Sequence, residues 1–176
     1  MALTATMRRF EIALADSDRD HYVDLDLRVA QHPSETDRGL VARVVARALE
    51  DRDGVELTRG LCVTDEPAIW QHNLRGELEA WIEVGHPSPE RLHKAQKACA
   101  RVAVYAWRRV EALASEIRAA KIHRAETLEL YAFEESFLDA LAAKLERNNR
   151  WALSRSGGSL YIDVASSLCE GTVRTV

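Results

Sequence analysis

Residues 77–107 read ELEAWIEVGHPSPERLHKAQKACARVAVYAW. Apolar and polar residues alternate over 77–84, and this period of two predicts a half-buried β-strand. Ser88-Pro89 then predicts the cap and first turn of a helix over 89–98, because proline suits the first helical position. Residues 102–107 are apolar on both faces, which is typical of a buried central strand. A strand, a helix and a further strand in this order predict a mixed α/β fold.

The preceding part of the chain predicts further strands and one long helix. Alternation predicts a β-hairpin of two strands, Phe10–Leu14 and Tyr22–Ala30, with a polar loop at Asp16–Asp20. Ser34 is expected to cap a helix over 34–50, and a short strand follows at 55–58. The segment 59–75 is expected to be irregular.

The C-terminal part continues the same mixture of elements. Apolar spacing predicts helices over 110–120 and 133–145, with a strand between them at 128–132. Two short strands, 151–156 and 160–164, flank Gly157-Gly158 and predict a hairpin. Since no repeat, linker or low-complexity tract interrupts the chain, residues 1–176 are expected to form a single domain.

The charge balance limits the classes of partner. The 176 residues are 47% hydrophobic and 30% charged, enough for one core without a metal or disulfide. Lys and Arg number 24 against 28 Asp and Glu, which gives a net charge of −4. Phosphate binding is driven by clustered Lys and Arg. A surface that is basic throughout is therefore excluded, whereas a local basic groove is not.

The chain is expected to be cytoplasmic, with no membrane partner. Its start has no apolar stretch behind a basic segment, and no run approaches the ~20 apolar residues of a membrane span. Cys62, Cys99 and Cys169 lie far apart and are odd in number, which is typical of reduced thiols.

Several common motifs are absent or incomplete. The spacing Asp16-x-Asp18-x-Asp20 imitates a calcium loop, but His21 and Leu27 stand where that loop needs glycine and a bidentate glutamate. No Gly-rich phosphate loop precedes a Lys-Ser or Lys-Thr pair, so nucleotide hydrolysis has no support. The run SGGS at 156–159 lacks the strand–turn–helix context of a hydrolase nucleophile.

The remaining candidates for catalytic residues lie in an acid-rich middle segment, which contains Asp65, Glu66, Glu77, Glu79 and Glu83. A basic helix with Arg91, Lys94 and Lys97 follows it. Carboxylates on neighbouring strands can hold Mg²⁺, which acidifies a water, while a lysine orients that water or neutralises developing charge. Glu79 and Glu83 share a face but lie about 13 Å apart, at ~3.3 Å per residue, so they cannot ligate one ion. Glu83 therefore needs a partner from another segment, and Asp65 or Glu66 is the best-placed candidate.

Four motifs in order resemble the YaeQ family of bacterial proteins: HPSET at 32–36, TRGLC at 58–62, DEP at 65–67 and WIEVG at 81–85. The resemblance covers nearly the whole chain. That family is uncharacterised in function, and its fold is understood as a variant of the restriction-endonuclease-like PD-(D/E)XK core: a helix, an antiparallel meander, a helix and a further strand. The resemblance implies this core, with an N-terminal β-hairpin and a C-terminal β-hairpin as additions.

Under this resemblance Glu83 looks like the acid of the (D/E)XK strand. Gly85 stands where that motif has its lysine. Some nucleases of the superfamily supply the cation from the following helix, and Lys94 is the matching candidate.

The first acid of the motif would be Asp65 or Glu66, and Glu79 is an alternative if the strand register differs. The resemblance thus implies a magnesium site held by Glu83 and Asp65.

Three further side chains are candidates for substrate binding. Arg59 and Trp70 lie near the acids in sequence and could bind a phosphate and stack a base; Arg91 is the third. A structural role is the alternative for Trp70, because large aromatic residues carry much of the packing. Taking Leu92 as the inward direction of its helix, Lys94 lies about 200° away, which favours a solvated face.

Two functions fit these residues. The first is magnesium-dependent phosphodiester hydrolysis by Glu83 with Asp65 or Glu66 and Lys94, which requires these groups to converge. The second is a catalytically inactive module with the same scaffold that binds nucleic acid or a protein partner. Gly85 and the acidic balance favour the second function over a general DNA binder.

Overall fold

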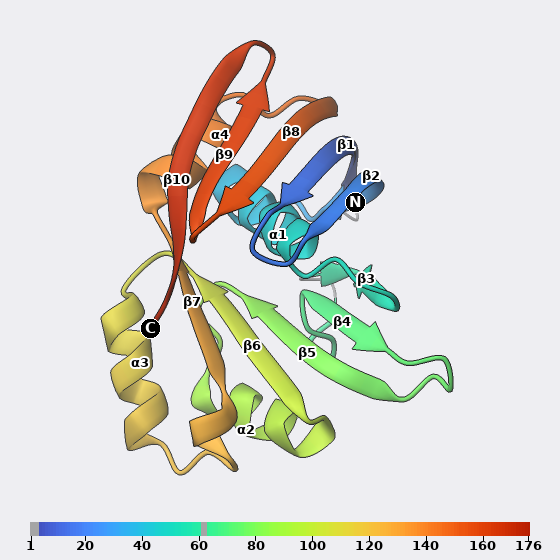
Figure 1. Ribbon diagram of the computed structural model, residues 1–176. Helices are drawn as coiled ribbons and strands as arrows, with labels where there is room; N and C mark the ends of the chain where they lie inside the picture. The colour runs from blue at the N-terminus through green and yellow to red at the C-terminus, as the bar shows by residue number, and fades with distance from the viewer. Residues whose placement is uncertain (1–3, 61–62) are drawn as a thin grey trace.

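The computed structural model describes residues 4–60 and 63–176. In this part of the chain ten strands form one sheet, with helices on both of its faces (Figure 1). In chain order the elements are β1 (Thr6–Asp16), β2 (His21–Gln31), α1 (Asp37–Leu49), β3 (Val55–Leu57), β4 (Ile69–His72), β5 (Leu78–Val84), α2 (Pro89–Ala98), β6 (Arg101–Ala106), α3 (Val110–Ala119), a 3-10 turn (Ala125–Thr127), β7 (Glu129–Phe133), α4 (Glu135–Ala142), β8 (Asn148–Ser156), β9 (Ser159–Val164) and β10 (Ser167–Thr175).

The sheet has the order β2-β1-β8-β9-β10-β7-β6-β5-β4-β3. β1 pairs with β2 in an antiparallel hairpin and with β8 in parallel, so the two ends of the chain share one sheet. β10 pairs first with β9 and then, over its last three residues, with β7. From there β7, β6 and β5 are parallel neighbours, and β5, β4 and β3 form an antiparallel meander. The predicted terminal additions are therefore continuous with the central sheet.

Helix α1 supplies the core that both halves of the sheet share. All ten of its residues from Leu40 to Leu49 are buried. The surrounding core includes Phe10 and Leu153 from one half of the sheet, and Ile82 and Phe133 from the other. Since side chains from both halves pack around one helix, α1 joins them into one structure.

A second core lies between the opposite face of the sheet and the helices α2 and α3. Leu92 of α2 packs there with Trp81 of β5. Successive side chains of a strand point to opposite faces, so Ile82 faces α1 while Trp81 and Glu83 face α2. This alternation positions the carboxylate of Glu83 beside the start of α2.

Local sequence signals predicted several elements correctly. Helix α2 begins at Pro89 and ends at Ala98, as the Ser88-Pro89 pair predicted, and the side chain of Ser88 accepts from the backbone N–H of Arg91. The strands β5 and β6 lie within one residue of the predicted 77–84 and 102–107.

The predicted cap of the first long helix is wrong. Thr36 caps α1, because its hydroxyl accepts a hydrogen bond from the backbone N–H of Gly39 at 3.0 Å. Ser34 instead contacts His32, with its hydroxyl 2.6 Å from Nδ1. The helix therefore begins at Asp37 rather than at residue 34.

Two strands were absent from the sequence prediction. β4 lies within the segment 59–75 that was expected to be irregular; its four residues are too few to show a period, and pairing with β3 and β5 holds it. β10 turns the predicted C-terminal hairpin into three strands. Its inward-facing Gly171 hides the alternation, because a Cβ there would lie 2.5 Å from the side chain of Phe137.

Cys99 and Cys169 are free and buried, as expected of reduced thiols, and Cys62 lies outside the described residues. None of the helices in the described ranges is long and apolar enough to cross a membrane.

Candidate functional site

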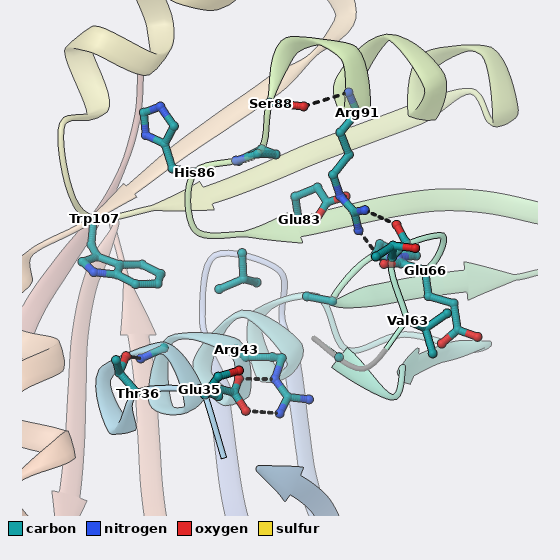
Figure 2. Close-up of a pocket in the computed structure, with 18 residues that line it drawn as sticks. Glu35, Thr36, Arg43, Val63, Glu66, Glu83, His86, Ser88, Arg91 and Trp107 are labelled. Carbon is teal, nitrogen blue, oxygen red and sulfur yellow. Dashed lines mark hydrogen bonds and ion pairs between the residues drawn. The ribbon is translucent and has the colours of Figure 1, made fainter. Parts of the chain in front are cut away.

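A cavity of about 520 Å³ lies where the end of β5 meets the starts of α1 and α2 (Figure 2). The segment before β4 forms another part of its wall. Three glutamates and two arginines from these segments line the cavity: Glu35, Glu66, Glu83, Arg43 and Arg91. Trp107, which follows β6, and His86 also line it, as do four hydroxyl residues: Ser34, Thr36, Thr64 and Ser88.

Glu83 is held by two donors. Its side chain is 8% exposed, and its Oε1 accepts hydrogen bonds from Trp81 Nε1 at 2.6 Å and Arg91 Nε at 2.5 Å. Hydrogen bonds to ionised groups are the strong ones in proteins. The carboxylate is therefore neutralised within the protein.

Arg91 binds oxygen atoms from three residues. Besides Glu83, its guanidinium donates to the backbone carbonyls of Thr64 and Glu66, the latter at 2.5 Å. It also lies 5.8 Å from the ring centroid of Trp81, within cation–π range. The hydrogen bonds of Arg91 thus connect the segment before β4 to the end of β5.

Glu35 and Arg43 form a second buried pair in the cavity. Arg43 Nε and Nη2 donate to the two carboxylate oxygens of Glu35 at 2.9 and 2.8 Å, and the two side chains are 4% and 7% exposed. The sequence prediction missed this pair. Glu35 lies inside the HPSET motif that was recognised, whereas Arg43 interrupts the apolar run of α1, and both were signals available in the sequence.

The two predicted first acids lie in different places. Asp65 pairs with Lys94 Nζ at 2.6 Å, and both side chains are largely exposed, at 77% and 63%. This hydrogen bond and the charge of Lys94 lower the pKa of Asp65. Glu66 lines the cavity and pairs with Arg59 at 2.8 Å, and that hydrogen bond lowers the pKa of Glu66.

The structure therefore brings together a different set from the predicted one. Glu66 shares the cavity with Glu83, and Arg91 is the α2 cation that reaches Glu83. Lys94 lies on the exposed side of α2, as its 200° offset predicted, and contacts Asp65.

The remaining predicted residues lie outside this cavity. Trp70 of β4 lines a separate groove with Arg59, and its ring packs edge-on against His72. Glu79 is exposed and accepts a hydrogen bond from Gln71. Neither Trp70 nor Glu79 contributes to the lining around Glu83.

The side chains around Glu83 do not fit a magnesium ion. Among residues 4–60 and 63–176, no group of three or more His, Cys, Asp or Glu side chains could hold a metal. The carboxylates of Glu83 and Glu35 are already bound by Arg91 and Arg43. A magnesium ion would first have to displace an arginine, and Mg²⁺ needs oxygen ligands in near-octahedral geometry.

Gly85 stands where the predicted (D/E)XK motif would have its lysine. Its φ is +115°, a region that side-chain-bearing residues rarely adopt. The chain turns sharply here, between the end of β5 and the start of α2, so a lysine two residues after Glu83 would be strained.

Three kinds of comparison relate this chain to known proteins. A family model described as YaeQ protein matches residues 1–173. Proteins from Escherichia coli (strain K12) and Salmonella typhi, both described as uncharacterized protein YaeQ, are 37% and 36% identical over 107 residues, which is 61% of this chain. The matched stretch spans 59% of each of these relatives.

Solved structures match over more of the chain. The crystal structure of a YaeQ protein from Xanthomonas axonopodis pv. citri has a TM-score of 0.89 at 31% identity and covers 98% of both chains. That from Pseudomonas syringae has a TM-score of 0.90 at 28% identity, and covers 98% of this chain and 96% of its own.

Proposed function

Since the chain belongs to the YaeQ family, we propose that it is a nuclease-like module that binds a protein partner and does not hydrolyse phosphodiesters. The order α1, then β3, β4 and β5, then α2 and β6 supports a PD-(D/E)XK type of core. The observation that carries the proposal is the position of Arg91.

The guanidinium of Arg91 occupies a space bordered by oxygen atoms of the kind that bind divalent cations. A carboxylate oxygen of Glu83 and the backbone carbonyls of Thr64 and Glu66 surround it. Carboxylates and backbone carbonyls are also the ligands that hard divalent cations prefer. Arginine stays protonated at any physiological pH, so this positive charge is permanent and supports a module that works without a metal.

The charges of the cavity favour a protein over nucleic acid as the partner. Glu35 and Glu83 are matched by Arg43 and Arg91, and Glu66 is matched by Arg59. Nucleic-acid affinity depends on a surplus of Lys and Arg that releases counterions from phosphates. A cleft in which acids and arginines balance, beside apolar and aromatic side chains, is closer in composition to a protein interface.

A thermal-shift titration with Mg²⁺ and Mn²⁺, beside a cleavage assay on fluorescent DNA and RNA, tests the proposal. Wild type is expected to show no metal-dependent shift and no cleavage. Arg91→Ala, which exposes the oxygen atoms that held the guanidinium, is expected to gain a Mn²⁺-dependent shift that Arg91→Ala/Glu83→Ala loses. Wild-type cleavage, or an Arg91→Ala variant indifferent to metal, would overturn the proposal.

Metal-dependent phosphodiester hydrolysis is the second candidate. It is favoured by one observation, the presence of Glu66 and Glu83 in the same cavity. Under this function Arg91, rather than Lys94, would supply the cation from α2. Magnesium-dependent cleavage by wild type that disappears in Glu83→Ala, but persists in Lys94→Ala, would select it.

A further inference from the structure

The two edge strands of the sheet, β2 and β3, lie on opposite sides of a groove of about 280 Å³. Residues 28–30 of β2 and 56–57 of β3 line it, together with Trp70 of β4 and Arg43 of α1. We call this the edge groove. β2 and β3 are the terminal strands of the sheet order, so the groove separates the two ends of the sheet.

The edge groove passes between the strands rather than along one face of the sheet. Arg28 is exposed and Val29 is buried, so the two neighbours point to opposite faces of β2, and both line the groove. Arg43 reaches it from α1, which lies on the inner face. Residues from both faces of β2 and from α1 therefore line one groove at the edges of the sheet.

In the described part of the chain, β2 pairs only with β1 and β3 only with β4, so each strand has one edge without a neighbouring strand. The carbonyl of Ala30 on β2 is already bound by Arg43 Nη2 at 2.9 Å, so an added strand would pair with the other residues of this edge or displace that contact. Edge strands present unpaired N–H and C=O groups that template pairing with another chain. Here two such edges flank one groove.

We propose that an extended segment of the partner protein binds in the edge groove as an added strand between β2 and β3. This inference rests on the proposed function, since it gives the protein partner a binding mode. Main-chain hydrogen bonds supply affinity in strand addition, and pockets for alternate side chains supply specificity.

The chemistry of the groove defines the segment. Arg28 and Glu56 are both exposed and line the groove from β2 and β3, and the charge of Arg28 also acts on Asp26. A segment with an acidic residue beside Arg28 and a basic residue beside Glu56 has the matching charges. Trp70 and the half-exposed Met7 present an apolar surface for an alternate residue. Arg43 and Glu66 line both the edge groove and the cavity, so a bound segment would reach the ion pairs of the cavity.

A random 12-residue peptide library displayed on phage and selected on the full chain tests this inference. Enriched peptides are labelled with fluorescein and titrated by anisotropy. Arg28→Glu and Trp70→Ala are expected to weaken binding at least tenfold, and Tyr22→Ala, an exposed aromatic on β2 away from the groove, is the unchanged control. Hydrogen exchange is expected to slow in residues 27–31 and 55–58. Because Arg28 is exposed, Arg28→Glu keeps the test valid even if Trp70→Ala does not fold.

Other outcomes separate this inference from the proposed function. Peptides that keep their affinity in Arg28→Glu but lose it in Trp107→Ala bind the cavity, which overturns the edge groove and leaves the proposed function standing. If the selection enriches no peptide, both the inference and the proposed function are overturned. A dimer that Arg28→Glu dissociates assigns the groove to a second copy of the chain. A 12-nucleotide single strand that binds wild type but not Arg28→Glu assigns it to nucleic acid. Both results overturn the inference.

Discussion

Gly85 stands where the (D/E)XK motif has a lysine, and its backbone conformation disfavours any side chain. At φ of +115° a side chain strains the backbone, and such strain costs on the order of 1–3 kcal/mol. Gly85→Ala and Gly85→Lys are therefore both expected to lower the free energy of unfolding by this amount, measured by urea denaturation. Neither is expected to gain magnesium-dependent cleavage. Cleavage by Gly85→Lys would show instead that the loss of the motif lysine alone had silenced a nuclease.

Glu83 and Asp65 each form an ion pair with a residue of α2, but their burial differs. Glu83→Gln leaves the partly buried Arg91 without its carboxylate, and the free energy of unfolding is expected to fall by about 2–3 kcal/mol. Asp65→Asn removes a pair that solvent screens, so urea unfolding should match wild type. Equal losses in the two variants would contradict the structural role assigned to Glu83.

At the scale of the element, the start of α1 depends on one hydroxyl. Removing a threonine cap costs about 1 kcal/mol, because an N–H of the first turn loses its acceptor. Thr36→Ala is expected to show this loss in urea unfolding. Ser34→Ala, two residues away and outside the helix, is the control and should leave stability unchanged. A loss of stability in Ser34→Ala but not in Thr36→Ala would mean that Ser34 caps the helix, as the sequence pattern predicted.

The buried carboxylate of Glu50, the residue after α1, forms hydrogen bonds with two residues of β6. Glu50 accepts hydrogen bonds from Arg101 at 2.7 and 3.0 Å and from the hydroxyl of Tyr105 at 2.7 Å. Burial by itself would raise the pKa of Glu50, but the hydrogen bonds and charge of Arg101 outweigh it and lower this pKa. The folded protein therefore favours the ionised form of Glu50.

This lowered pKa predicts a pH dependence of stability. The folded-state pKa lies below the unfolded value of 4.5, so the contribution of Glu50 is fully present above that pH and lost as the pH falls towards the folded pKa. Glu50→Gln is expected to cost about 2–3 kcal/mol at pH 7. Urea unfolding from pH 7 to 3.5 should show the difference from wild type shrinking below about pH 4.5. Glu126→Gln, at an exposed position, is the control and should leave the free energy of unfolding at pH 7 close to that of wild type.

Local signals account for what the sequence predicted of these elements. Ser88-Pro89 defined the start of α2, and alternation defined β2 and β5. β10 was missed because Gly171 leaves room for Phe137 and so removes an inward side chain from the pattern. No local sequence pattern shows that Phe137 of α4 occupies the space where residue 171 of β10 would otherwise have a side chain.

The candidate site was predictable only in part, for a related reason. Glu83 was identified from its strand, and Asp65 and Glu66 from their proximity in sequence. Which cation meets Glu83 depends on how α2 packs on β5, and that packing selects Arg91 over Lys94. Glu35 and Arg43 pair because α1 is buried from Leu40 to Leu49, so Arg43 is shielded from solvent and binds a carboxylate inside the protein.

At the scale of the whole molecule, β10 connects two halves of the sheet. It pairs with β9 over Ser167–Thr172 and with β7 only over Val173–Thr175, so the connection to β7 depends on three residues. A second link does not involve strands, because α1 packs against side chains from both halves. Removing the last residues of the chain deletes the link through β10 and keeps the link through α1.

A chain that ends at Thr172 loses the pairing of β10 with β7 and the buried side chain of Val173, but keeps the core around α1. Because that core draws on both halves, the truncated chain is expected to unfold in a single transition, at a lower urea midpoint than wild type. Circular dichroism and tryptophan fluorescence should give coincident curves. A chain that ends at Thr175 keeps all three pairs and should stay close to wild type. Two separate transitions in the shorter chain would mean that the strands, rather than α1, unite the molecule.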